Sequence, residues 1–147
     1  MLCRVVKHGH RLIGRQKWRD RGRPEAALVG IQYLDWSGHA YPNAPYVVVS
    51  AGSAPWLFHG TGLRNGRRFG RYGIEIDARA ASSPRGLRTL ARVPDIFGPG
   101  KSAEMAYYRT SRGAKVFAAG TLNFGGSAEL RVPSRMLHNL WARLSRP

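Results

Sequence analysis

Two carboxylates separated by a single residue are the first candidates for chemistry. Glu75 and Asp77 alternate with Ile74 and Ile76, a pattern typical of a β-strand with one buried face. Alternate side chains of a strand share a face, so we expect both carboxylates on the same side. Carboxylates placed in this way transfer protons in hydrolysis. We predict that Glu75 is catalytic and that Asp77 contacts substrate; the alternative for Glu75 is a structural ion pair with an arginine.

A polar, glycine-rich segment provides the second group of candidates. The run 121–127 (TLNFGGS) follows the apolar run 114–119 and is predicted to be a loop. The Asn123 amide and the Thr121 hydroxyl are suited to donate hydrogen bonds to a substrate carbonyl or a developing oxyanion. We therefore predict a catalytic role for Asn123 and substrate binding by Thr121. The alternative is a loop whose side chains bond to its own backbone.

Histidine and cysteine give weaker signals. His59 follows the apolar residues 56–58 and precedes a turn; we expect it at the surface and count it among the substrate contacts. His8 and His10 would share one face of a strand, as metal ligands can, but they lack a third partner. Cys3 is the single cysteine, which excludes an internal disulfide and a cysteine-rich zinc site. We expect no metal ligands on this chain.

Short strands are expected to position these residues. The sequence predicts strands at 26–33, 46–49, 74–77, 87–93, 104–109 and 114–119. The first should bury Leu28, Val29 and Ile31, the second should be covered on both faces, and the last two should form a hairpin. A turn is expected at Asn65-Gly66.

One long helix is predicted at the C-terminal end. Its apolar residues recur at helical spacing: Val132, Met136, Leu137, Leu140, Trp141 and Leu144. We expect Trp141 to pack on the sheet. A strand, a loop and a helix in this order close a layered α/β sheet. In open parallel sheets ligands bind beyond the carboxyl ends of the strands, so we expect 114–119 to be an interior strand and 121–127 to open onto a pocket.

Length and charge limit the class of protein. The 147 residues suit one domain. Lys and Arg number 24 against 8 Asp and Glu, a net charge of +16, and residues 1–23 form a basic start expected to be poorly ordered. Such a charge is typical of proteins that bind nucleic acid or an acidic partner, but we prefer the explanation that it reflects an arginine-rich genome. No run of 18 apolar residues is present, and we expect a cytoplasmic protein without membrane contact.

Three segments resemble one known family. Residues 44–66 (APYVVVSAGSAPWLFHGTGLRNG), 69–77 (FGRYGIEID) and 104–127 (EMAYYRTSRGAKVFAAGTLNFGGS) look like the C-terminal end of the N,N-dimethylformamidase large (beta) subunit. The similarity runs in order from about residue 25 to residue 144. The strand and helix after Gly113 also resemble the closing unit of class I glutamine-amidotransferase-like domains.

The resemblance implies an enzyme that hydrolyses the carbon–nitrogen bond of small linear amides, formamides above all. It implies an α/β, layered glutamine-amidotransferase-like (flavodoxin-like) fold, of which residues 1–147 would be a strand-rich, partial C-terminal domain with one long helix. It also implies an iron ion held by two tyrosines and a glutamate that precede the matched region. Tyr107 and Tyr108 are adjacent, so they should face opposite sides of a strand. We expect the chain to be inactive alone and to need an upstream region or other subunits. The alternative is a basic module without catalytic activity that binds nucleic acid or an acidic partner.

Overall fold

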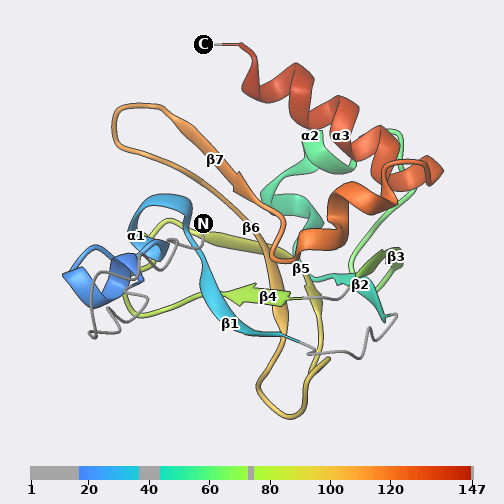
Figure 1. Ribbon diagram of the computed structural model, residues 1–147. Helices are drawn as coiled ribbons and strands as arrows, with labels where there is room; N and C mark the ends of the chain where they lie inside the picture. Colours follow the sequence, from blue (N-terminus) through green and yellow to red (C-terminus); the bar gives the residue numbers. More distant parts are fainter. Residues whose placement is uncertain (1–16, 37–43, 73–74, 147) are drawn as a thin grey trace, which may run out of the picture.

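An antiparallel sheet of five strands forms the centre of the computed structural model, which describes residues 17–36, 44–72 and 75–146 (Figure 1). The order across the sheet is β3 (Arg68–Tyr72), β2 (Ala44–Val48), β5 (Arg88–Val93), β6 (Ala103–Arg109) and β7 (Lys115–Ala118). A second, two-stranded sheet pairs β1 (Gln32–Trp36) with β4 (Glu75–Ala78). Every strand pairing in the described part of the chain is antiparallel.

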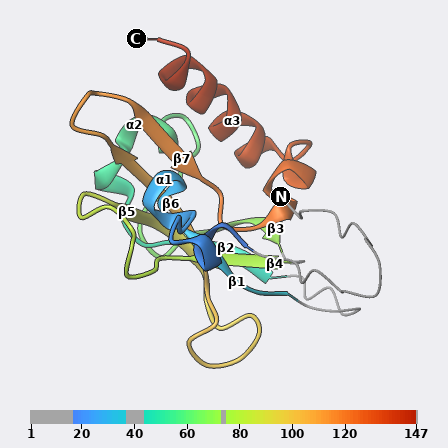
Figure 2. The same cartoon turned by 60° about the vertical axis from the view of Figure 1, so that its left-hand side comes forward.

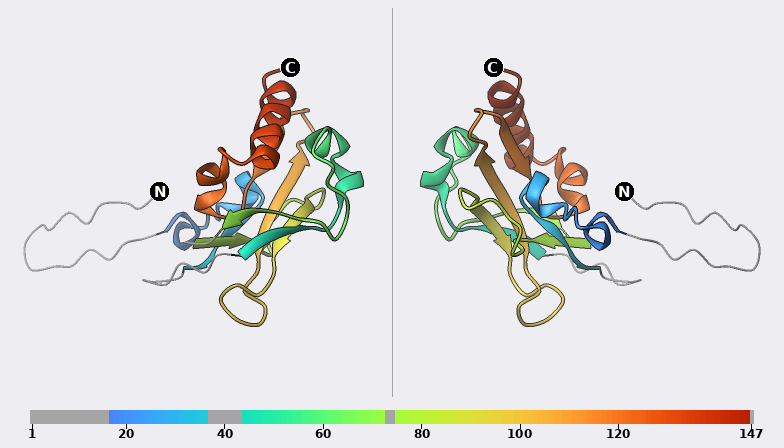
Figure 3. Two further views of the ribbon diagram at one scale, coloured as in Figure 1. Left: turned by 90° about the vertical axis from the view of Figure 1, so that its right-hand side faces the viewer. Right: turned by 90° about the vertical axis from the view of Figure 1, so that its left-hand side faces the viewer.

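Helices cover the sheet unequally. The long helix α3 (Arg131–Leu144) and the short helix α2 (Pro55–Phe58) lie together over one face, and α1 (Ala26–Val29) lies near the other (Figures 2 and 3). Three 3₁₀ helices complete the described elements: η1 (Trp18–Arg21), η2 (Ala51–Ser53) and η3 (Leu122–Ser127). The fold therefore has mixed helix and strand content and one long C-terminal helix, as the sequence predicts.

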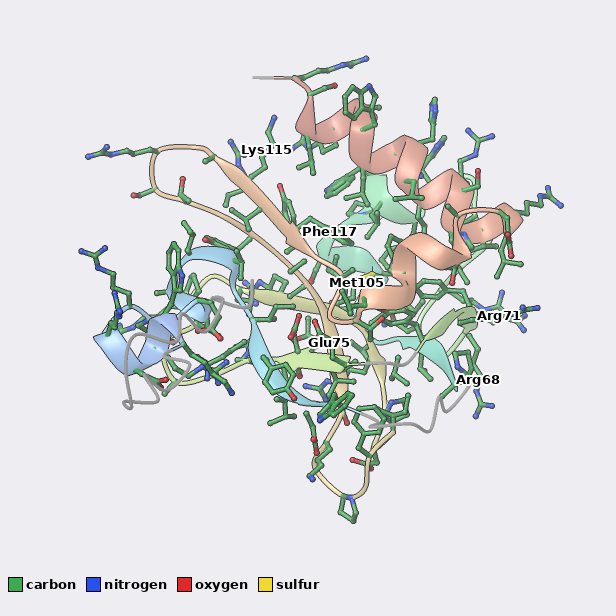
Figure 4. All side chains as sticks on the ribbon, in the orientation of Figure 1. Arg68, Arg71, Glu75, Met105, Lys115 and Phe117 are labelled. Atoms are coloured by element: carbon green, nitrogen blue, oxygen red, sulfur yellow. The ribbon has the colours of Figure 1, made fainter. Side chains whose placement is uncertain are left out.

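Two apolar clusters hold these layers together. The larger lies between the sheet and the helices α2 and α3, and its fully buried side chains include Tyr46, Leu57, Leu90, Met105 and Met136. Figure 4 shows Phe117 of β7 and Met105 of β6 on the side of the sheet toward α3. A smaller cluster on the opposite face contains Ile31, Leu87, Ala106 and Tyr108. The sheet is thus covered on both faces.

Several predicted elements are confirmed. The strands β6 and β7 form the expected hairpin, with Tyr107 opposite Phe117, and β5 ends before Pro94. The turn at Asn65-Gly66 is present, with Gly66 at a φ of 83°. In β2 the prediction holds only in part, because Tyr46 and Val48 are buried whereas Val49, just after the strand, is 39% exposed. One end of this strand is therefore open to solvent.

The strand predicted at 26–33 is wrong in its first half. Residues 26–29 form the helix α1, which ends at Gly30 with a φ of 90°, and the strand starts only at Gln32. Leu28 and Val29 are 65% and 42% exposed, and only Ile31 of the three predicted core residues is buried. A left-handed residue ends a helix readily when it is glycine, and this signal outweighs the apolar run that precedes it.

The prediction that 114–119 is an interior strand is also wrong. In the described residues, β7 forms one border of the five-stranded sheet. Residues 120–121, which follow β7, pair with β4 on the outer side of the sheet. The Asp77 N–H donates to the Gly120 carbonyl at 2.8 Å, and Ile76 lies opposite Thr121. Because all the pairings are antiparallel, the rule that places ligands at the carboxyl ends of parallel strands does not locate a site here.

The segment after β7 and the flank of α3 differ from expectation too. Residues 122–127 form the helix η3 where a loop was predicted. Its last residue, Ser127, is buried and its hydroxyl accepts from the Arg71 N–H at 3.1 Å and donates to the Arg71 carbonyl at 2.9 Å. Trp141 is 77% exposed, so it does not pack on the sheet. Its neighbours Met136 and Leu140 carry the helix packing instead.

Candidate functional site

The strand β4 holds both candidate carboxylates on one face. Ile76 between them is fully buried in the larger core, so Glu75 and Asp77 point the other way and are partly exposed. The strand is fixed on both sides, by β1 and by the Gly120–Thr121 backbone. Two carboxylates are therefore held on a clamped strand, as the alternation of residues predicts.

The strand β1 and the segment before it surround this face. Tyr33 is the register partner of Asp77, and Trp36 is the partner of Glu75. Directly opposite residues in an antiparallel pair place their side chains on the same side. Arg19 donates to the Tyr33 carbonyl at 3.2 Å and forms an ion pair with Glu25. An arginine and a third carboxylate thus lie beside the pair on β4.

The surroundings of Asp77 change its acidity. Burial raises the pKa of the Asp77 carboxyl to about 6, and the negative charges of Glu75 and Glu25 add to the increase, whereas Arg19 opposes it. The pKa of Tyr33 is raised as well, first by burial and then by Asp35 and Glu75. A carboxyl group with a pKa near neutrality exchanges its proton at working pH. Raised carboxyl pKa values occur both at proton-transfer sites and in structural networks of charged groups.

Glu75 has no ion-pair partner in the described part of the chain. The ion pairs there engage Glu25, Glu104 and Asp35. Two arginines of β3, Arg68 and Arg71, lie toward the other side of the molecule and point away from Glu75 (Figure 4). The alternative role of Glu75, as half of a structural ion pair, is thus not seen among these residues.

Thr121 is close to β4 in the backbone but turns toward the core. It is 8% exposed, and its Oγ1 lies 3.3 Å from the Tyr46 hydroxyl, which donates to the Ala119 carbonyl at 2.6 Å. Its register partner is the buried Ile76, so the hydroxyl is on the face opposite to the Glu75 and Asp77 carboxylates. The structure does not bring the three polar groups together.

Thr121→Val tests this placement. The substitution removes one buried hydrogen bond and keeps the shape, so we expect the free energy of unfolding to fall by about 1 kcal/mol. Denaturant unfolding of the two proteins measures the difference. A change near zero would show that the contact between Thr121 and Tyr46 contributes nothing to stability.

The two remaining predicted residues lie elsewhere. The backbone of Asn123 belongs to η3, and its side chain is outside the described residues. His59 ends α2 and is exposed, and its carbonyl accepts from the Asn139 amide at 2.8 Å. This places His59 with α2 and α3 rather than beside β4 (Figure 1). The pair His8 and His10 also lies outside the described residues.

One polar residue was missed by sequence reasoning. Glu104 is only 7% exposed, accepts from the Arg79 N–H at 3.0 Å and forms an ion pair with Arg92 at 2.8 Å. It fastens the chain after β4 to the central sheet. A buried ion pair could have been predicted from the sequence, because Glu104 stands at the start of an apolar strand in a chain with many arginines.

Comparison with protein families identifies the chain. The model of the family described as "N,N-dimethylformamidase beta subunit-like, C-terminal" matches residues 3–137. The chain belongs to this family. A search of the curated proteins finds no match. In the described residues, no helix has the length and apolar character needed to cross a membrane.

Tyr107 and Tyr108 do not together form the iron site that the resemblance to dimethylformamidase implies, in which two tyrosines and a glutamate hold the ion. In the described residues there is also no group of three or more His, Cys, Asp and Glu that could hold a metal ion. Tyr107 packs in the cluster below α3, whereas Tyr108 packs in the opposite cluster and donates to the Leu28 carbonyl. The two tyrosines face opposite sides of β6, as predicted, so they do not form a joint pair of ligands.

Asp77→Asn should raise stability at high pH only. Because folding raises the pKa of this group, its contribution to stability is complete below the unfolded value of about 4 and is lost as pH rises toward the folded value. At pH 8 the native state must hold a partly buried charge, which asparagine removes. After allowance for solvent screening we expect the variant to be about 1–2 kcal/mol more stable at pH 8, and equal to the original near pH 3.5. Equal stability of both proteins at pH 8 would contradict the burial of this charge.

Proposed function

We propose that this chain forms one wall of the active site of an amide hydrolase that resembles N,N-dimethylformamidase. The observation that carries the proposal is the gathering of acids around β4. Three of the eight Asp and Glu of a chain with 24 basic residues lie on or beside the outward face of β4: Glu25, Glu75 and Asp77. Acidic residues clustered on one face of a strongly basic protein are unexpected. Membership of the dimethylformamidase-like family supports a role for them in amide hydrolysis.

Hydrolysis of an amide requires two proton movements. Water loses a proton as it attacks the carbonyl carbon, and the leaving amine gains one as the carbon–nitrogen bond breaks. Glu75 is assigned the transfer, because it is partly exposed and has no ion-pair partner among the described residues. Asp77, whose pKa is about 6, shares its face and contacts the substrate.

Other predicted residues take lesser parts in the proposal. The Asn123 amide is assigned to the oxyanion that develops on the substrate carbonyl. Thr121 is held by Tyr46, so its part is to fix the backbone that clamps β4. His59 lies with α2, where it would meet only an extended substrate or a second part of the enzyme.

Iron belongs to the proposal only as a group held elsewhere. When bound, such an ion polarises the amide carbonyl and lowers the pKa of a bound water. Its ligands would come from the polypeptide that the family places before this C-terminal part, or from another subunit. We propose accordingly that the chain is inactive alone, that its complete domain is glutamine-amidotransferase-like and layered, and that the enzyme acts in the cytoplasm. The family description names a beta subunit, which supports an enzyme with more than one kind of subunit.

Expression of the chain with and without its upstream region and partner subunits tests the proposal. Small formamides and acetamides are supplied as substrates, release of amine is measured, and iron is assayed in the purified protein. We expect amine release and bound iron from the complete enzyme and neither from the chain alone. A complete enzyme that contains no iron and hydrolyses none of these amides would contradict it. Family membership does not favour the alternative of a nucleic-acid-binding module.

A further inference from the structure

The outer border of β7 is an open strand edge of defined length. Residues Lys115–Ala118 pair with β6 on one side, and no described strand pairs with the other side. The edge is closed at one end, where Gly120 and Thr121 meet β4. At the other end it runs into the β6–β7 hairpin (Figures 1 and 2). An added strand would therefore find about four residues with which to pair.

Apolar side chains flank this edge on both sides of the sheet. On the α3 side, helical spacing puts Trp141 and Leu144 on the same flank as Leu137, away from the Asn139 side chain that bonds to α2. Trp141 is 77% exposed and Leu144 is 39% exposed. On the opposite side, the neighbouring helix α1 leaves Leu28 65% exposed and Val29 42% exposed. The sheet and both of its covering layers thus end together at one apolar border.

Described residues protect the other border of the sheet, but none of them protects this one. The edge strand β3 carries two exposed arginines, Arg68 and Arg71, and is bonded to Ser127 of η3 (Figure 4). Charged side chains and covering segments are the usual protection of strand edges. On β7 the only charge is Lys115, whose ammonium donates to the carbonyls of Arg143 and Arg146 at the end of α3. The Lys115 ammonium therefore lies toward α3 and does not prevent another strand from pairing with the edge.

The charge near this border specifies the partner. Residues 105–147 carry seven Arg and Lys against a single acid. Four of the arginines are exposed at the hairpin or at the end of α3: Arg109, Arg112, Arg143 and Arg146. A second copy of the chain carries the same net charge of +16, so self-pairing is disfavoured. The hairpin and the end of α3 both lie at the Lys115 end of the edge, so the complementary segment is acidic at that end and apolar beyond it.

We propose that the open edge of β7 binds an extended segment of a partner polypeptide, which adds as a strand to the sheet. The segment is a short, β-branched apolar run with acidic residues at the end that meets Lys115. Its backbone pairs with Lys115–Ala118, and the layers beside it cover Trp141 and Leu144 on one face and Leu28 on the other. Strand addition of this kind takes its affinity from main-chain hydrogen bonds and its specificity from the side chains on each face. The proposal does not depend on amide hydrolysis.

A pair of peptides tests the edge on the isotopically labelled protein. The first has four valines flanked by two glutamates at each end, so that an acidic end meets Lys115 in either strand direction, and the second has lysines in place of the glutamates. Backbone amide and indole resonances are followed as peptide is added. We expect saturable shifts at Lys115–Ala118 and Trp141 with the acidic peptide only, and binding about tenfold weaker in about 0.5 M salt.

Two surface variants provide the matched comparison. Leu144→Gln and Val49→Gln change apolar residues that are each 39% exposed, and only Leu144 lies at the proposed edge. We expect Leu144→Gln to weaken binding of the acidic peptide at least several-fold and Val49→Gln to leave it unchanged. Shifts that map to β3, equal binding of both peptides, or equal effects of the two variants would overturn the proposal.

Discussion

Glu75→Gln in the complete enzyme is expected to lower kcat for amide hydrolysis by about 10²- to 10⁴-fold, the range that proton transfer by one side chain contributes. Glutamine keeps the size and polarity of the side chain but can neither accept nor release the proton. Because Glu75 is partly exposed and forms no ion pair with any described residue, the free energy of unfolding should change by less than about 0.5 kcal/mol. Steady-state kinetics and denaturant unfolding of the same preparations measure both quantities.

A neighbouring carboxylate supplies the control. Asp35 lies on β1 and accepts from the Lys101 ammonium at 2.6 Å, and that bond lowers the pKa of Asp35. Asp35→Asn removes the same charge from the same small sheet and should leave kcat within about twofold. Iron content is measured in both variants, because an unchanged metal content separates loss of proton transfer from loss of the metal. Turnover of Glu75→Gln equal to that of the original enzyme would remove Glu75 from the mechanism.

Local patterns predicted the elements that local contacts stabilise. The β6–β7 hairpin follows from two apolar runs joined by a short turn, and it forms with Thr110 bonded to Ala114 across the turn. The helix α3 follows from apolar spacing, and Met136 and Leu140 are buried as that spacing requires. The alternation around Ile76 predicted that Glu75 and Asp77 share a face, and they do. In each case the spacing of apolar residues and the residues of the turns were enough to predict the element.

Non-local pairing decided the features that the sequence did not reveal. The same residues in β7 could have formed an interior or an edge strand, since the apolar run only shows that both faces are covered. Trp141 belongs to the apolar stripe of α3, but that stripe covers more of the helix surface than the sheet and α2 can bury. The positions of α2 and the sheet decide which part of the stripe is buried, and Trp141 lies outside that part. The partnership of Glu104 with Arg92 and Arg79 joins segments that are distant in sequence. The spacing of apolar residues along the chain does not reveal which distant segments come into contact.

Gly120→Ala is expected to destabilise the chain strongly, because the added methyl group has no room. A Cβ on Gly120 would lie 2.3 Å from the carbonyl oxygen and 2.6 Å from the carbonyl carbon of Glu104. Both are backbone atoms of β6, which is paired on both sides in the sheet, so they cannot move aside as the end of a side chain can. The φ of 82° adds the cost of a left-handed conformation. Together these effects should lower the free energy of unfolding by about 3 kcal/mol or more.

Substitutions of two other glycines distinguish the effect of the close contact from the effect of the left-handed backbone on the free energy of unfolding. Gly62 has a φ of 71° with nothing within 4 Å of a Cβ, so Gly62→Ala should cost only the conformational part, about 1 kcal/mol. Gly125 has open space and no left-handed backbone, so Gly125→Ala should be neutral or slightly stabilising. Chemical denaturation of the three variants gives the order, and equal losses for Gly120→Ala and Gly62→Ala would refute the close contact with Glu104. Since the Gly120 carbonyl holds the Asp77 N–H, displacing this residue also moves the strand that carries both carboxylates. Any Gly120→Ala enzyme that folds should therefore lose turnover together with stability.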